Sequence, residues 1–201
     1  TMSYGHKARD WRVFESIFIN TLAHYRRLFS RTAHYKVILQ LQGKIIHIVD
    51  STTISLCLNL FSWARFRTTK GAIKIHTQLD ESSELPVVVY ISEGRVHDRR
   101  GIDHLSIQNG SVLIDDRGYF DFDAFVSYYA RSITFVTRIK SNTDIKTCRQ
   151  EMLTDQDMQA GVTQAQTIQM RGNKAFESTL CDYDLRLVTI WDKVNKRNCK
   201  Y

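Results

Sequence analysis

Hydrophobic residues recur at helix and strand spacings along most of the chain. From residue 11 to 29 they stand three and four positions apart, which predicts an amphipathic helix. Residues 44–50, 72–79 and 87–91 have the apolar character of strands, and a polar turn at 80–84 joins the second strand to the third. The chain is therefore expected to open with one helix followed by three short strands, the last two forming a hairpin.

The next segments alternate between helix and strand. A short helix is predicted from Asp98 to Ile107 with Asp98 as its N-cap, and a strand at 111–115 follows. Helical spacing returns at 122–129 and strand character at 133–139. Because helical crossovers join parallel strands, this order predicts an α/β fold, a mixed sheet flanked by helices in which only the first three strands are antiparallel.

Beyond Lys140 the chain becomes polar and favours strands, with one helix expected at 148–154. The predicted strands of this region are 162–170, 175–182 and 184–191. The pattern therefore divides the chain into three parts. These are an N-terminal helical segment at 1–36, an α/β core at 37–140 and a β-rich region at 141–201.

Charge and composition limit the kinds of partner that the chain is expected to bind. Of the 201 residues 43% are hydrophobic, enough for a core, while 28 Lys and Arg against 21 Asp and Glu give a net charge of +7. The positive balance favours a polyanion, with nucleic acid the leading candidate. A membrane partner is not expected, because no apolar run reaches the roughly 18 residues of a spanning helix and residues 1–10 are too polar for a secretory leader. Four cysteines without metal-type spacing indicate reduced thiols in a cytoplasmic protein.

Two acidic residues, Asp50 and Asp116, each end a run of buried-type residues. If the two strands are parallel neighbours, both carboxylates lie at one edge of the sheet, where Mg²⁺ takes oxygen ligands. The alternative for Asp50 is a turn or helix-capping role. Asp115 competes with Asp116, and only one of them should reach a metal because adjacent strand residues face opposite ways.

A basic stretch separates the first two strands. Its cations are Arg65, Arg67, Lys70 and Lys74, with no acid among them. They are candidates for contacts with DNA phosphates, and the alternative is an ordinary solvated face. Trp63 and Phe66 lie within the stretch and suit either base stacking or the core, with the core favoured for Trp63.

Two further motifs stay open. Arg117 suits a phosphate contact and an ion pair with a neighbouring acid equally well. The pair His97 and Asp98 could suggest a metal site, but a helix cap beside a hydrogen-bonded histidine explains it, and that structural role is favoured.

Four motifs carry a resemblance to a known family. In order they are Asp50-Ser51-Thr52-Thr53-Ile54, Lys70-Gly71-Ala72-Ile73-Lys74-Ile75-His76, Gly94-Arg95-Val96-His97-Asp98 and Asp116-Arg117-Gly118-Tyr119. Together they resemble the DDE transposases of bacterial insertion sequences, of the family-four type, over about residues 37 to 195. The resemblance implies an RNase H-like core that binds two Mg²⁺, with Mn²⁺ as a substitute, through three acids, of which Asp50 is the first and Asp116 the second. It also implies that water cuts DNA at the ends of the insertion sequence and that the 3′-hydroxyl then attacks target DNA.

The chain departs from this family at the third acid. Relatives carry it in a Tyr-Arg-Glu-Lys signature on a helix after a β-rich insertion, and no such signature precedes Tyr201. Glu151 and Glu177 lie outside that motif and are not assigned. We therefore expect a C-terminally truncated transposase that is inactive alone. The resemblance further implies a homodimer acting on paired DNA ends and a nucleoid-associated location in the bacterial cytoplasm. Two alternatives are a structure-directed nuclease of the same fold and a non-catalytic DNA-binding remnant that represses transposition.

Overall fold

The computed structural model describes residues 10–29, 41, 43–57, 64–67, 70–81, 83 and 85–201, and of residues 29 and 65–67 it describes only the backbone. Trp63 lies outside the described residues, as do residues 30–40, which contain the expected boundary at 36. The helices and strands, in chain order, are α2 (Trp11–Phe29), β1 (Ile46–Leu56), β2 (Arg65–Arg67), β3 (Lys70–Asp80), β4 (Leu85–Glu93), α3 (Asp98–Ile102), β5 (Val112–Ile114), η2 (Arg117–Tyr119), α4 (Phe122–Ala130), β6 (Thr134–Val136), β7 (Ile145–Gln150), α5 (Asp155–Gln159), β8 (Val162–Met170), α6 (Asn173–Glu177), η3 (Leu180–Asp182), β9 (Leu185–Asp192) and β10 (Arg197–Lys200).

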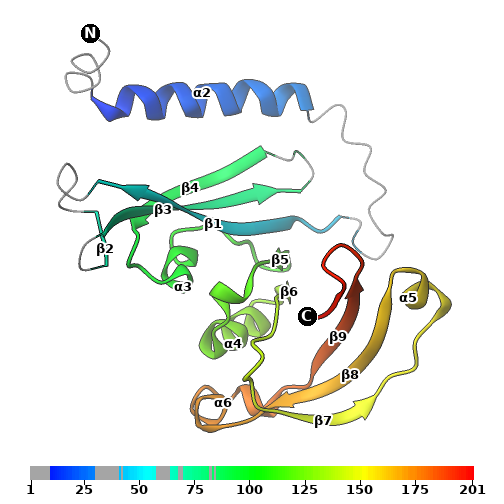
Figure 1. Ribbon diagram of the computed structural model, residues 1–201. Helices are drawn as coiled ribbons and strands as arrows, with labels where there is room; N and C mark the ends of the chain where they lie inside the picture. Colours follow the sequence, from blue (N-terminus) through cyan, green and yellow to red (C-terminus); the bar gives the residue numbers. More distant parts are fainter. Residues whose placement is uncertain are drawn as a thin grey trace.

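A mixed sheet forms the centre of the fold (Figure 1). Its strands follow the order β2, β3, β1, β5, β6, and β4 also pairs with β3. The pairs β1–β3 and β3–β4 are antiparallel, whereas β1–β5 and β5–β6 are parallel. Antiparallel pairing of β1, β3 and β4 followed by the parallel strands β5 and β6 confirms the predicted α/β architecture, and the short β2, which was not predicted, adds a fourth antiparallel strand. With the flanking helices this arrangement is consistent with an RNase H-like fold.

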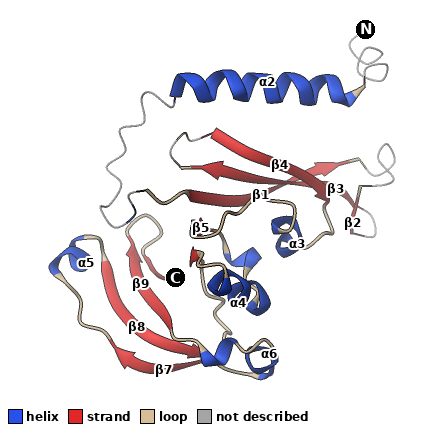
Figure 2. Ribbon diagram, turned by 180° about the vertical axis from the view of Figure 1, so that it is seen from behind, coloured by secondary structure: helices blue, strands red, loops and turns tan. Residues whose placement is uncertain are grey.

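Helices lie on both faces of this sheet (Figures 1 and 2). On one face lies α2, where the predicted helix at 11–29 is confirmed. The backbone N–H of Arg12 donates to the carboxylate of Asp10 at its start (3.0 Å), and Arg26 Nη2 donates to the carbonyl oxygen of Pro86 at its end (2.9 Å). On the other face lie α3 and α4.

One hydrophobic core joins the main sheet to the β-rich region. It brings Val49 and Leu113 of the main sheet and Phe125 of α4 together with Ile168 and Leu187 of the second sheet. That second sheet is antiparallel, in the order β10, β9, β8, β7. The two sheets therefore pack on each other through shared apolar side chains rather than forming separate cores. The boundary proposed at 140–141 stays a prediction.

Several expected elements differ from the structure. The helix expected at 148–154 is wrong, because β7 occupies Ile145–Gln150 and a capping box at Thr154 starts α5 one residue later. The strand expected at 175–182 is also wrong. There α6 and η3 form instead, since the chain turns at Thr179, whose φ of 64° no strand adopts.

The first strand is longer than its apolar run. The predicted strand ended at residue 50, but residues 51–56 extend β1 because each of them pairs with β3. The short helix is also shorter than predicted, ending at Ile102 instead of Ile107, and its N-cap is His97, not Asp98. The Nδ1 of His97 accepts the backbone N–H of Arg99 (3.3 Å), so the carboxylate of Asp98 is available for other contacts.

Candidate metal and DNA site at the sheet edge

The two candidate acids lie beyond one parallel strand pair. In the β1–β5 register Ile46 stands beside Val112 and Ile48 beside Ile114. The pairing ends there, two residues before Asp50 and two residues before Asp116. Side chains at matching positions of neighbouring strands point to the same face, so a register continued by two residues would direct both carboxylates to the same face at this edge of the sheet.

Both carboxylates are exposed to water. Neither takes part in an ion pair or a side-chain hydrogen bond with any other residue that the structure describes. Asp50 belongs to the middle of β1, so its predicted alternative as a helix cap has no helix to serve. Asp116 precedes the 3-10 helix η2, and its carbonyl oxygen accepts the backbone N–H of Tyr119 (2.9 Å).

Asp115 faces the interior instead. Its side chain is 8% exposed, and neither carboxylate oxygen has a hydrogen-bond partner of good geometry among the described residues. Burial raises the pKa of Asp115 to about 6; the nearby Thr137 hydroxyl lowers it, and the negative charge of Asp116 raises it further. The geometry therefore favours Asp116 over Asp115 as the group available to a metal, although the assignment stays a proposal.

A polar cluster lies directly behind Asp50. The hydroxyl of Ser51 donates to Asp98 Oδ1 (2.8 Å), and Lys74 Nζ donates to the same oxygen (2.9 Å) and to the carbonyl oxygen of Val96 (2.9 Å). Burial alone would raise the pKa of Asp98, but the hydrogen bonds from Lys74 and Ser51 and the charge of Lys74 hold it below its usual value. Asp98 is therefore an ionised acceptor that joins β1, β3 and the start of α3.

Beneath this cluster the buried ring of His76 lies between two hydroxyl groups. His76 Nδ1 lies 3.4 Å from Tyr119 Oη, and His76 Nε2 lies 3.1 Å from Ser92 Oγ. Burial, with the charges of Asp98 and Asp50 added, raises the pKa of Tyr119 far above its usual value even though Ser51 opposes the shift. The phenol therefore stays neutral and fixes η2 against the sheet.

The predicted DNA-contacting cations fall into two groups. Arg65 pairs with Gly71 and Arg67 with Lys70 where β2 meets the start of β3, and Lys70 is exposed. The side chains of Arg65 and Arg67 are outside the described residues. Because Gly71 pairs with Leu56, this basic tip lies six residues along β1 from Asp50, or about 20 Å at strand rise.

The other two cations lie nearer the acids. Arg117 is exposed and follows Asp116 directly, with no ion pair among the described residues. Lys74 is only 14% exposed and forms the ion pair with Asp98. Its ammonium group already has two acceptors, so a phosphate would have to compete with them.

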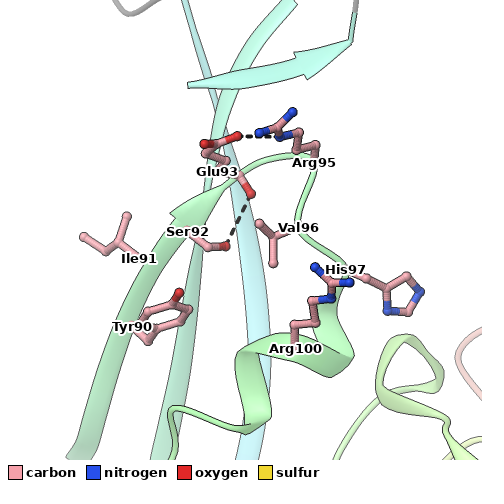
Figure 3. A pocket seen from close by; sticks show the side chains of 8 residues that line it. All are labelled: Tyr90, Ile91, Ser92, Glu93, Arg95, Val96, His97 and Arg100. Atoms are coloured by element: carbon pink, nitrogen blue, oxygen red, sulfur yellow. Dashed lines mark hydrogen bonds and ion pairs between the residues drawn. The ribbon is translucent and has the colours of Figure 1, made fainter. Parts of the chain in front are cut away.

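A cavity of about 720 Å³ lies at the end of β4 (Figure 3). Sequence reasoning singled out neither of the arginines that line it, Arg95 and Arg100. Arg95 Nε forms an ion pair with Glu93 (2.6 Å), while Arg100 stands on α3 beside Val96. The available signal was the position of Arg95 inside the Gly94–Asp98 motif and of Arg100 two residues after it. A larger apolar cavity of about 880 Å³ between β6 and the second sheet offers little catalytic chemistry.

Two exposed carboxylates at one edge fit a hard divalent cation such as Mg²⁺ or Mn²⁺, which takes oxygen ligands. Among the described residues, no three His, Cys, Asp or Glu side chains are arranged to hold a metal. Glu151 instead accepts from Thr167 Oγ1 (2.9 Å) and Arg186 Nε (2.9 Å) on the second sheet, and Glu177 is an exposed residue of α6.

Comparison with known proteins agrees with this fold and with the pair of acidic residues at the edge of its sheet. The family profile described as "Transposase DDE domain" matches residues 41–197. The chain therefore belongs to the DDE transposase domain family, which confirms the resemblance carried by the four motifs. Within the described residues, no helix is both long and apolar enough to cross a membrane.

Two curated relatives are transposases by name. A putative transposase, y4zB, of Sinorhizobium fredii is 29% identical over 109 residues, which is 54% of this chain and 30% of the relative. A probable transposase for insertion sequence element IS5377 of Geobacillus stearothermophilus is 28% identical over 102 residues, which is 51% of this chain and 27% of the relative. The matched part thus spans less than a third of either relative.

Proposed function

We propose that this chain carries two of the acids of a transposase that cuts DNA at the ends of an insertion sequence and joins the 3′-hydroxyl to target DNA. The observation that supports the proposal most directly is the β1–β5 register, which ends two residues before Asp50 on β1 and two residues before Asp116 after β5. Family membership supplies the class of reaction. The fold alone would not, because the same fold serves unrelated functions.

In this proposal Asp50 and Asp116 hold divalent metal ions, Mg²⁺ or Mn²⁺, between them. When bound, such ions activate an attacking oxygen and stabilise the leaving oxygen of an in-line phosphodiester displacement. Asp50 pairs with Thr77 of β3, and β1 pairs with β5 up to two residues before it, while the carbonyl oxygen of Asp116 accepts the backbone N–H of Tyr119. These backbone bonds restrain the two carboxylates, which would favour binding of a cation between them.

The cations define a path for the DNA. Arg117 beside Asp116 would contact a phosphate near the cleaved bond, and the tip formed by Arg65, Arg67 and Lys70 would contact the backbone about 20 Å away. That distance matches about six base pairs at the 3.4 Å rise of duplex DNA. Lys74 lies between them and contributes to the positive potential, whether or not it touches a phosphate.

A second function, DNA binding without cleavage, is favoured by the lack of a third carboxylate beside Asp50 and Asp116 among the described residues. With two charged ligands the site would hold its cations weakly. The 201-residue chain alone is then expected to bind DNA and to cut it poorly. Dimer formation on paired DNA ends, as the family resemblance implies, belongs to the same proposal.

The test is a Mn²⁺ titration of the purified chain, followed by the loss of the free-ion signal in electron paramagnetic resonance. Asp50→Asn and Asp116→Asn should each abolish specific binding, because each removes half of the charged ligands. Glu151→Gln is the matched control, since it removes a carboxylate from the second sheet. Its affinity for Mn²⁺ should equal that of the wild type.

Equal loss of Mn²⁺ binding in all three variants would contradict the site. In a chain that also cleaves oligonucleotides carrying insertion-sequence ends, joining of the 3′-end to target DNA would support a transposase. Hydrolysis without joining would instead support the structure-directed nuclease. Survival of cleavage in Asp116→Asn but not in Asp115→Asn would move the second ligand to Asp115.

A further inference from the structure

The carboxylate of Asp98 lies against both of the segments that carry the candidate metal ligands. Its Oδ1 accepts the hydroxyl of Ser51, the residue directly after Asp50 on β1 (2.8 Å). Sequence analysis gave it the role of a helix cap, but His97 performs that role. The side chain of Asp98 is therefore directed away from its own helix and toward β1.

The other oxygen of Asp98 faces the segment after Asp116. Gly118, two residues beyond Asp116, lies so close that a Cβ added there would come within 2.9 Å of Asp98 Oδ2. The neighbouring Tyr119 is fully buried, so η2 cannot easily move away from Asp98. One carboxylate thus touches the chain just after the first candidate ligand and the chain just after the second.

Lys74 holds this carboxylate in place. Its Nζ lies 2.9 Å from Asp98 Oδ1, and the two side chains are only 14% and 23% exposed. A partly buried ion pair is less screened than a surface pair and fixes both side chains, because each would otherwise be a desolvated charge. Lys74 Nζ also donates to the carbonyl oxygen of Val96, which ties the loop before α3 to β3.

We propose that Asp98, fixed by Lys74, is a positioning residue that sets the separation of Asp50 and Asp116 and thereby the affinity of this edge for a divalent cation. Asp98 acts through Ser51 on one side and through Gly118 on the other and does not itself bind the cation. The inference rests on the proposed function for the role of Asp50 and Asp116. The link between the two segments is independent of it and is tested separately.

The experiment compares Asp98→Asn, Ser51→Ala and Asp103→Asn in the full chain. Asp98→Asn keeps the size of the side chain but loses the charge that binds Lys74. Ser51→Ala is the milder variant, in case Asp98→Asn fails to fold. Asp103→Asn is the matched control, since it removes the same charge from the end of the same helix, where Asp103 is 62% exposed and pairs with Arg99 (2.8 Å).

Two quantities are measured for each variant. The first is Mn²⁺ affinity, which should fall about tenfold or more in Asp98→Asn and less in Ser51→Ala, as for other residues that orient metal ligands. The second is amide hydrogen exchange, which should become faster in Asp98→Asn at both 50–52 and 117–119. Asp103→Asn should change neither quantity.

Unchanged exchange at either segment in Asp98→Asn overturns the proposal, as does an equal loss of affinity in Asp103→Asn, which would indicate a general charge effect. A wild-type chain that binds no Mn²⁺ through Asp50 and Asp116 overturns the proposed function and with it the metal role of Asp98. The exchange measurements still decide in that case whether Asp98 joins the two segments.

Discussion

The imidazole ring of His76 lies against Gly101 so closely that a Cβ at residue 101 would overlap it. The ring cannot move aside, because it is fully buried and its two nitrogens lie near Ser92 Oγ and Tyr119 Oη. This contact sets the distance of α3 from β3. Glycine is required at residue 101 for space, not for backbone conformation.

Gly101→Ala should therefore destabilise the fold by about 1–3 kcal/mol, the usual cost of overpacking. In a chain of this size each kcal/mol lowers Tm by about 2–4 °C, so thermal unfolding followed by circular dichroism resolves the effect. The control is the same Gly101→Ala substitution in a His76→Ala variant, which lacks the imidazole ring. If Gly101→Ala costs as much in that background as in the wild type, steric overlap is not the cause.

The buried Asp115 should make stability depend on pH. Its pKa is about 6 in the fold, largely through burial, against about 3.9 when unfolded, so the folded state holds the proton more tightly. The stability that this proton contributes is present below about pH 4 and is lost as the pH rises through about 6.

Asp115→Asn cannot ionise. The unfolding free energy of the variant minus that of the wild type should therefore be about 2 kcal/mol larger at pH 7.5 than at pH 4. Urea denaturation at both pH values measures this difference. Asp144→Asn is the control, because that carboxylate is exposed to water and is not among the groups that shift the pKa of Asp115. A pH-independent difference between Asp115→Asn and the wild type would show that the residue is ionised in the fold.

Lys70 and Lys74 should differ in DNA binding, although the sequence grouped them together. Lys70 is exposed, and each phosphate contact contributes about 0.9 to the slope of log affinity against log salt. Lys70→Ala should lower that slope by about one, measured by fluorescence anisotropy on duplex DNA. Lys74→Met should leave the slope unchanged and lower Tm, because Lys74 is paired with Asp98. If both variants change the slope equally, Lys74 breaks its ion pair with Asp98 and contacts a DNA phosphate instead.

Much of the main sheet could be predicted because its strands are apolar runs bounded by turns. The extension of β1 through residues 51–56 could not, since Ser51, Thr52 and Thr53 are polar and become a strand only by pairing with β3. The predicted strand at 175–182 failed for a related reason. Its apolar residues Ala175 and Leu180 are buried, but from short helical turns.

The site also contains residues that the sequence could predict and residues that it could not. Asp50 and Asp116 could be named from the sequence because each ends a run of apolar residues and belongs to a motif. The role of Asp98 could not be predicted, because its partners Ser51 and Lys74 are 47 and 24 residues away in the chain and meet it only through strand pairing. An aspartate before a short helix is usually a cap, and only the fold shows that His97 has taken that position.

Because β1 and β5 end at different points, the two sides of this edge of the sheet differ. β5 ends at Ile114, two residues before Asp116, whereas β1 continues six residues past Asp50 and carries β3 along with it. The two acids therefore lie where the parallel pairing has ended and where β1 continues for about 20 Å as part of the antiparallel strands β1, β3 and β4. A molecule bound to both carboxylates would lie beside this antiparallel extension, on the side where β5 and β6 have ended.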